Sequence, residues 1–236
     1  MFPGLPATVN LQGRLRLTIA AAAGALGWWL APPRCVLCGS AGAAARLDLC
    51  VHCLRRLPVQ AAAVRFDEPA FDALLAPWHY GYPVDAMLRA LKFQGELAHG
   101  RVLGSLLGRQ RLSLSRALPS LVVPMPLHPA RLAERGYNQA RELAAAAANA
   151  CALPLDCHLL NRIRNTRPQT RLDRVSRRNN MRSAFACTRQ VDGQDVALVD
   201  DVTTTGATAR AAAIALRAAG VRRLEFWVAA RVVRGE

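Results

Sequence analysis

Residues 196–208 read VALVDDVTTTGAT, an apolar run that ends in two adjacent aspartates and continues into a threonine-rich loop with one glycine. The run 196–199 is typical of a strand that is buried on both faces, as in a parallel sheet covered by helices. The segment 209–219 that follows consists of strong helix formers, and Gly220 is placed to end that helix. The loop is therefore expected to join a buried strand to a helix.

This strand-to-helix loop is suited to binding a phosphate. Amide N–H groups in the first turn of a helix lack intrahelical partners and carry the positive end of the helix dipole. Hydroxyl groups can donate to phosphate oxygens, whereas carboxylates can accept from sugar hydroxyls. A ribose 5-phosphate is expected here, held by Asp200, Asp201, Thr203, Thr204, Thr205, Gly206 and Thr208. The alternative is a strand that ends in a solvated aspartate pair and a hydroxyl-stabilised turn.

The same thirteen residues resemble the motif with which type I phosphoribosyltransferases bind phosphoribosyl pyrophosphate (PRPP). A wider resemblance, to the competence protein F (ComF) family, covers about residues 30–236. It rests on LKF at 91–93, PMPLHPARLAERGYNQA at 124–140, RPQTRLDRVSRRNN at 167–180 and two N-terminal CxxC pairs. The resemblance implies an α/β fold with a type I phosphoribosyltransferase-like parallel sheet, helices on both of its faces and an N-terminal zinc ribbon. It also implies a link, in some bacteria, to the uptake of single-stranded DNA.

The resemblance assigns two further segments to the pyrophosphate of PRPP. Segment 124–140 resembles the pyrophosphate loop, in which Gly136 interrupts a helical pattern. Segment 165–180 resembles the mobile loop that closes over PRPP. The side chains implied as pyrophosphate contacts are Arg131, Arg135, Asn138, Gln169 and Arg178. The alternative for the first segment is a surface helix with ordinary basic residues.

Lys92 is the only lysine of the chain, in a sequence that otherwise uses arginine. Its ammonium is a compact charge that can bind phosphate or donate a proton. It ends a predicted helix, VDAMLRALKF at 84–93, whose apolar positions face inward. The alternative is a lysine favoured at a helix end by the dipole. We expect the catalytic residues to be Asp200, Asp201, Lys92 and Arg135.

The chain of 236 residues is 52% hydrophobic and carries a formal net charge of +15. The length allows one substantial core and a small accessory module, and the charge favours association with polyanions. Eight arginines and one aspartate lie between residues 162 and 182. This segment can be a solvated basic face, or it can contact phosphates of PRPP or of single-stranded DNA.

The cysteines form two groups. The pairs Cys35/Cys38 and Cys50/Cys53 have the CxxC spacing that suits tetrahedral thiolate ligation of a structural Zn²⁺. Two thioredoxin-type redox motifs are the alternative, but neither pair begins a strand–helix–strand unit. Cys151, Cys157 and Cys187 are scattered and are expected to be inert thiols, which is consistent with the cytoplasm.

The sequence predicts four segments, which are a helical lead (1–32), a zinc ribbon (33–57), connecting strand and helices (58–118) and the phosphoribosyltransferase core (119–236). The lead contains an apolar run that superficially resembles a signal peptide, but it is shorter than the about 20 residues a membrane helix needs. We interpret it as an amphipathic helix without stable membrane insertion. The residues do not fix the oligomeric state.

The function expected from the resemblance is PRPP binding in nucleotide metabolism. The chain would transfer phosphoribose to an acceptor that the residues do not identify, releasing pyrophosphate, with Mg²⁺ bridging the pyrophosphate and the ribose hydroxyls. The alternative is an accessory factor of competence and DNA uptake that binds single-stranded DNA and DNA-uptake proteins. In that case PRPP is an effector or a vestigial ligand.

Overall fold

The computed structural model describes residues 34–41, 47–60, 64–65, 70–164 and 184–232. The chain divides into two compact units, 1–51 and 52–236. The predicted division into four segments stays a prediction. The helical lead and the arginine-rich stretch after residue 164 lie outside the described residues, as do the predicted site residues Gln169 and Arg178.

Residues 34–41 of the first unit form a tight loop. Arg34 and Ala41 face each other in an antiparallel bridge. The N–H of Gly39 donates to the carbonyl of Cys35 at 2.8 Å, and the N–H of Cys35 donates to the carbonyl of Ser40 at 3.0 Å. Gly39 has a φ of 70°, a left-handed conformation that glycine adopts without steric cost. The chain therefore turns sharply at Gly39, directly after the first CxxC pair.

A six-stranded sheet forms the centre of the second unit. Its order is β1-β2-β8-β7-β4, and β3 also pairs with β8. Only the pairing of β1 with β2 is antiparallel, and the other pairings in this sheet are parallel. The strands are β1 (Val64–Arg65), β2 (Ala73–Leu75), β3 (Trp78–His79), β4 (Leu121–Pro124), β7 (Asp195–Thr203) and β8 (Arg223–Arg231).

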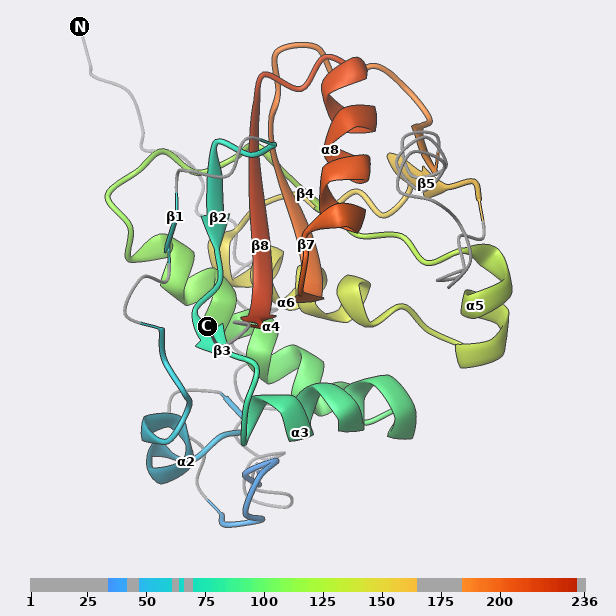
Figure 1. Ribbon diagram of the computed structural model, residues 1–236. Coiled ribbons are helices and arrows are strands. Elements are labelled where there is room, and N and C mark those ends of the chain that lie inside the picture. The colour runs from blue at the N-terminus through green and yellow to red at the C-terminus, as the bar shows by residue number, and fades with distance from the viewer. Residues whose placement is uncertain (1–33, 42–46, 61–63, 66–69, 165–183, 233–236) are drawn as a thin grey trace, which may run out of the picture. The chain divides into compact units, whose positions relative to one another are not determined.

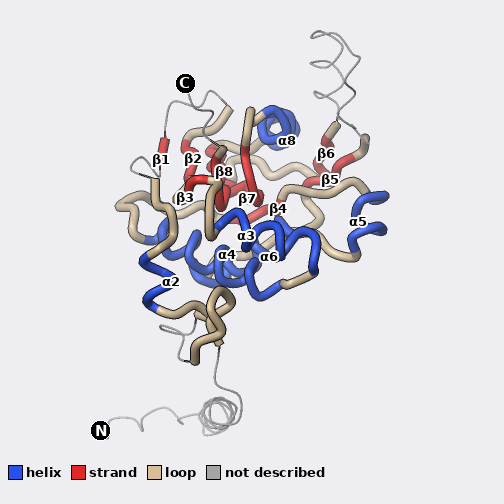
Figure 2. Tube along the Cα trace, turned by 60° about the horizontal axis from the view of Figure 1, so that its bottom comes forward, coloured by secondary structure: helices blue, strands red, loops and turns tan. Residues whose placement is uncertain are grey.

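Helices lie on both faces of this sheet (Figures 1 and 2), which confirms the predicted fold class. One face carries α8, and the other carries α4 and α6. A separate two-stranded antiparallel sheet of β5 and β6 lies beside α8. The remaining elements are α2 (Val51–Arg55), α3 (Val84–Arg89), the π-helical turn η2 (Ala90–Gln94), α4 (Leu97–Leu112), α5 (Pro129–Arg135), α6 (Gln139–Cys151), β5 (Leu160–Arg162), β6 (Phe185–Cys187) and α8 (Ala207–Ala218).

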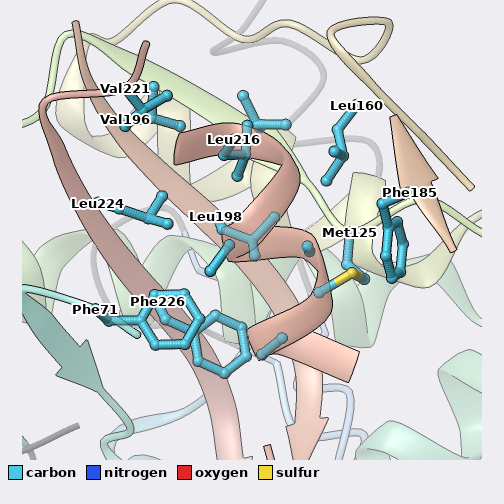
Figure 3. Close-up of a cluster of buried hydrophobic side chains, with 14 of the residues drawn as sticks. Phe71, Met125, Leu160, Phe185, Val196, Leu198, Leu216, Val221, Leu224 and Phe226 are labelled. Atoms are coloured by element: carbon cyan, nitrogen blue, oxygen red, sulfur yellow. The ribbon is translucent and has the colours of Figure 1, made fainter. Parts of the chain in front are cut away.

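The core on the α8 face fixes the loop that precedes this helix. Leu198 of β7, Phe226 of β8 and Leu216 of α8 are buried together there, and Phe71 stacks on Phe226 with ring centroids 5.0 Å apart (Figure 3). Burying one such side chain contributes about 1.5–3 kcal/mol. Because these residues come from both elements, strand and helix are held firmly on either side of the threonine-rich loop.

The helices on the other face pack at unusually close range. A Cβ atom on Gly104 of α4 would lie 2.3 Å from the carbonyl oxygen of Leu143 in α6, and one on Gly108 would lie 2.7 Å from that of Ala147. Only glycine allows the two helix backbones to approach so closely. This packing fixes the position of α6, whose first residue enters the candidate site.

The strand that contains the aspartates is longer than the predicted run 196–199. β7 spans nine residues, because its last part continues to pair with β8, where Asp200 faces Val228 and Thr203 faces Arg231. β4, its neighbour on the other side, ends opposite Val199. β7 therefore extends beyond the end of β4, and both aspartates lie at the carboxyl edge of the sheet, where open α/β sheets bind ligands.

Candidate functional site at the carboxyl edge of the sheet

The two aspartates lie side by side on β7 and are held by backbone amides. The N–H of Asp201 donates to Oδ1 of Asp200 at 2.9 Å, and the N–H of Val202 donates to Oδ1 of Asp201 at 2.8 Å. Burial raises the pKa of the Asp200 carboxyl well above its ordinary value, and the neighbouring Asp201 carboxylate raises this pKa further. The N–H of Asp201 and the charge of Lys92 act in the opposite direction. The pair thus carries concentrated negative charge that favours hydroxyl donors or a cation.

The threonine-rich loop follows directly and ends at the first turn of α8. Thr203 is buried, whereas Thr204 and Thr205 are exposed. Gly206 is the N-cap of α8 with a φ of 67°. The loop lines a small cavity of about 50 Å³ together with Phe71, Leu74, Ala209, Phe226 and Arg231. Exposed hydroxyls beside a helix N-terminus can receive an anion, as the sequence predicts.

The segment 129–151 forms two helices with a break between them. Gly136 ends α5 with a φ of 79°, and α6 begins at Gln139. Nη1 of Arg135 donates to Oε1 of Gln139 at 2.6 Å, and Nε2 of Gln139 donates to Oδ2 of Asp201 at 3.4 Å. This path of hydrogen bonds joins the predicted pyrophosphate loop to the aspartate strand, although the two are more than 60 residues apart in the sequence.

Two neighbouring side chains in this break have structural partners. The Asn138 side-chain oxygen accepts from the N–H of Ala140 at 3.0 Å and so caps α6, while its Nδ2 donates to the carbonyl of Met125 at 3.0 Å. The Tyr137 hydroxyl donates to the carbonyl of Leu91. Asn138 therefore holds the loop in shape, and its predicted contact with pyrophosphate stays a prediction.

Lys92 lies in η2, one residue after the fully buried Leu91. A π-helical turn is rare and is often found at functional sites. Its side chain lines a cavity of about 550 Å³, and its charge acts on Asp200. The same cavity is lined by Phe93, Gln94, Gly95, Arg131, Glu134, Arg135 and Tyr137. The structure thus brings Lys92, Arg131 and Arg135 together around one cavity beside the aspartates.

Two residues of this region were missed as site residues from the sequence. Gln139 is not among the predicted site residues, but it connects Arg135 with Asp201. Arg162 at the end of β5 interacts electrostatically with Arg131 and with Asp200. For Arg162 the available signal was its place in the arginine-rich stretch, which did not single it out from seven other arginines.

A second group of reactive side chains consists of Cys35, Cys38, Cys50 and Cys53. Their Sγ atoms all lie within 4.8 Å of one another. The distance between the Sγ atoms of Cys38 and Cys50 is 3.7 Å. This distance is too long for a disulfide, and it matches the separation of about 3.8 Å that follows from tetrahedral ligation with Zn–S bonds of about 2.3 Å. The four thiols can therefore hold a zinc ion.

The thiol of Cys35 is held in a setting that favours the thiolate. Burial raises its pKa, but backbone amides of Cys50, Cys38 and Leu37 lower it, and the net pKa lies below the ordinary value. Thiolates are the form that binds zinc. His52, between two of the cysteines in the sequence, lies near Arg56, with Nε2 3.5 Å from its Nη1, and is not one of the four clustered groups.

Within the described residues, no helix is long and apolar enough to cross a bilayer. The apolar run of the predicted helical lead, within residues 1–32, lies outside the described residues.

Fold and site together define an α/β protein with an acidic strand end, a phosphate-type loop and a cluster of four cysteines. The chain is 32% identical to Competence protein F of Haemophilus influenzae over 171 residues, which cover 70% of this chain and 75% of that protein. It is 28% identical to the DNA utilization protein YhgH of Escherichia coli O157:H7 over 220 residues, covering 89% and 93%. YhgH of Salmonella typhimurium is also 28% identical, over 203 residues, with 84% of each chain covered.

The chain belongs to the competence protein F (ComF) family. No family model matches it. Among solved structures it is similar to glutamine PRPP amidotransferase from B. subtilis, with a TM-score of 0.39, 22% identity, and coverage of 55% of this chain and 25% of that one. It is also similar to adenine phosphoribosyltransferase from Leishmania tarentolae, with a TM-score of 0.38, 14% identity and coverage of 69% and 77%. At these scores the likeness says nothing about function.

Proposed function

We propose that the carboxyl edge of the sheet binds PRPP. The observation that carries the proposal is the hydrogen-bonded path from Arg135 through Gln139 to Asp201, because it joins a basic loop to an acidic strand in one site. PRPP carries two anionic groups separated by a ribose with two hydroxyls. The site offers three matching parts in the same order, which are basic groups for the pyrophosphate, two carboxylates for the ribose and a phosphate-type loop for the 5′-phosphate.

Each part of the ligand has a matching part of the site. The carboxylates of Asp200 and Asp201 accept from the ribose hydroxyls. The 5′-phosphate lies against the loop 203–208, at the N-terminus of α8. The pyrophosphate lies in the cavity lined by Lys92, Arg131 and Arg135.

Mg²⁺ forms part of this proposal. Carboxylate oxygens such as those of Asp200 and Asp201, together with substrate phosphates, are the ligands that Mg²⁺ takes. When bound, the ion would supply charge neutralisation for the phosphates. The chain's own contribution is to fix the ribose through the two carboxylates, while Arg135 and Lys92 stabilise negative charge on the pyrophosphate.

The reaction proposed for this site is transfer of phosphoribose to an acceptor with release of pyrophosphate. Isothermal titration of the purified protein with PRPP and magnesium tests the binding step. We expect binding by the wild type and its loss in the double variant Asp200→Ala/Asp201→Ala. Asp192→Ala, which removes an exposed acid before β7, is the matched control and should bind normally. No detectable binding by the wild type, or equal binding by the double variant, contradicts the proposal.

The four clustered cysteines are proposed to hold a structural Zn²⁺. Atomic spectroscopy of the protein purified under reducing conditions should find about one zinc per chain. Cys50→Ser should lose the metal, whereas Cys187→Ser, which changes a thiol outside the cluster, should retain it. A zinc content far below one per chain in the wild type contradicts this assignment. A reduced thiolate site would fit a cytoplasmic location.

A second candidate function is binding of single-stranded DNA as an accessory factor in DNA uptake. It is favoured by the relatives, whose names are Competence protein F and DNA utilization protein. In this case PRPP would be an effector. Binding of a generic oligonucleotide through the arginine-rich segment 162–182 should weaken steeply with salt. A flat dependence on salt would exclude this surface, and release of pyrophosphate with an acceptor would identify an enzyme.

A further inference from the structure

Arg162 is held in place by an aromatic ring. It ends β5 and faces Phe185 across the antiparallel pair with β6. Its guanidinium carbon lies 5.6 Å from the centre of the Phe185 ring. Phe185 itself is only 5% exposed and belongs to the core beside Met125, as Figure 3 shows. A guanidinium stacked on a fixed ring has a restricted direction, which favours selective contacts.

The position of this guanidinium is electrostatically costly. Burial lowers the pKa of Arg162, and the nearby charge of Arg131 lowers it further, while Asp200 raises it. Two guanidinium groups are thus close enough to repel each other. Asp200, the acid that interacts with Arg162, has a raised pKa of its own. A bound anion would relieve this repulsion.

Three elements contribute basic groups to this region. Lys92 of η2 and Arg162 of β5 each interact electrostatically with Asp200, and Arg131 of α5 interacts with Arg162. Lys92 and Arg131 also line the cavity of about 550 Å³. Views of the molecule from two directions place β5 and α5 on the same side of the sheet (Figures 1 and 2). The basic groups therefore surround one region and do not form a single exposed helix face.

We propose that Arg162 binds the pyrophosphate group of PRPP, opposite Arg131, and that the ring of Phe185 positions its guanidinium. This inference rests on the proposed function of the same site. A planar guanidinium offers two parallel N–H donors to phosphate oxygens, so it suits a diphosphate better than a single ammonium does. Phe185 is a positioning residue, since it acts through Arg162.

The test compares three probes, which are PRPP, inorganic pyrophosphate and ribose 5-phosphate, each titrated calorimetrically. Arg162→Gln is expected to weaken pyrophosphate and PRPP about 10- to 100-fold and to leave ribose 5-phosphate unchanged. Arg162→Lys should lose less, because it keeps the charge without the planar fork. Phe185→Leu should weaken pyrophosphate by about 3- to 10-fold through loss of the stacked ring.

Arg189→Gln is the matched control. It removes one positive charge just after β6, where Arg189 pairs with Asp156 on the surface, and it should bind all three probes as the wild type does. If Arg162→Gln does not fold, as judged by thermal unfolding, the Arg162→Lys and Phe185→Leu variants decide the question.

The outcomes separate this inference from the proposed function. If wild type binds PRPP and Arg162→Gln binds pyrophosphate equally well, Arg162 has no such role, and PRPP binding stands. Equal weakening of all three probes, or weakening by Arg189→Gln as well, also overturns the inference, because it indicates a general effect of charge. If the wild type binds neither PRPP nor pyrophosphate, both proposals are overturned.

Discussion

The charged side chains at the amino end of β7 and β8 form ion pairs, whereas the aspartates at the carboxyl end form none with the described residues. At the amino end, Asp195 pairs with Arg222 at 3.0 Å and with Arg223 at 3.1 Å. At the carboxyl end, Asp200 and Asp201 lie side by side, and neither makes an ion pair with a described residue. Both ends belong to the same two strands, so the difference lies in the partners that the fold brings to each end.

The pairing at the amino end continues into the interior. Glu225 is 3% exposed and accepts from Arg111 at 2.7 and 2.9 Å, and Trp227 donates to it at 2.8 Å. Arg111 also donates to the carbonyl of Ala117 at 2.6 Å. Each buried charge there has its partners, as stability requires. By contrast, the aspartates at the carboxyl end have no ion-pair partner among the described residues. This difference is expected where a bound ligand supplies the compensating groups.

The largest effect is expected from breaking the compensated end. Glu225→Ala leaves the 2% exposed guanidinium of Arg111 without its carboxylate, so the free energy of unfolding should fall by about 3–5 kcal/mol. Denaturant unfolding followed by circular dichroism measures this loss. The double variant Arg111→Met/Glu225→Leu should be more stable than the single one, because no unpaired charge remains. A double variant as unstable as Glu225→Ala would contradict the unpaired charge of Arg111 as the cause.

An intermediate effect of opposite sign is expected at the carboxyl end. Because the folded state raises the pKa of Asp200, ionisation of this carboxyl destabilises the protein as the pH rises above the ordinary value of 3.8. Asp200→Asn removes that cost and should raise the free energy of unfolding near neutral pH, with little gain near pH 4. It should also abolish PRPP binding. Asp195→Asn is the comparison at the paired end and should destabilise instead.

The smallest effect is expected at Asp72, a partly exposed member of the paired end. Burial raises its pKa, but the N–H of Leu224 and the guanidinium of Arg217, at 2.7 and 2.6 Å, lower it below 3.8 overall. The stability that the Asp72 carboxylate contributes is therefore present above pH 3.8 and is lost as the pH falls through the lowered pKa. Asp72→Asn should cost about 0.5 kcal/mol at pH 7, given solvent screening. Unfolding curves of the two proteins should converge in acid, and a constant difference would refute the linkage.

Much of the local structure follows from residue patterns. The buried run 196–199 and the alanine-rich segment after the loop form a strand and a helix as predicted, and the helical pattern in segment 124–140 breaks at Gly136. In the predicted helix 84–93, the inward positions Val84, Met87, Leu88 and Leu91 are all buried. The change to a π-helical turn at Ala90 was not predictable, since the spacing of apolar residues does not distinguish it from an α-helix.

The site was predictable as two motifs but not as one arrangement. The residue pattern picked out the aspartates, and the resemblance picked out the basic loop. The role of Gln139 as the link between them depends on the depth at which α6 packs, which glycines of α4 permit. Arg162 could not be chosen among its neighbouring arginines, because only the pairing with Phe185 distinguishes it.

The sequence by itself determined the strand, loop and helix around residues 196–208 and the zinc-type spacing of four cysteines. It did so because these features depend on neighbours within a few positions along the chain. Only the tertiary structure decided which charges meet: Glu225 with Arg111, 114 residues away, and Asp200 with Lys92 and Arg162. These long-range pairings depend on strand order, register and helix packing. The whole core sets these three properties, so no single segment of sequence determines them.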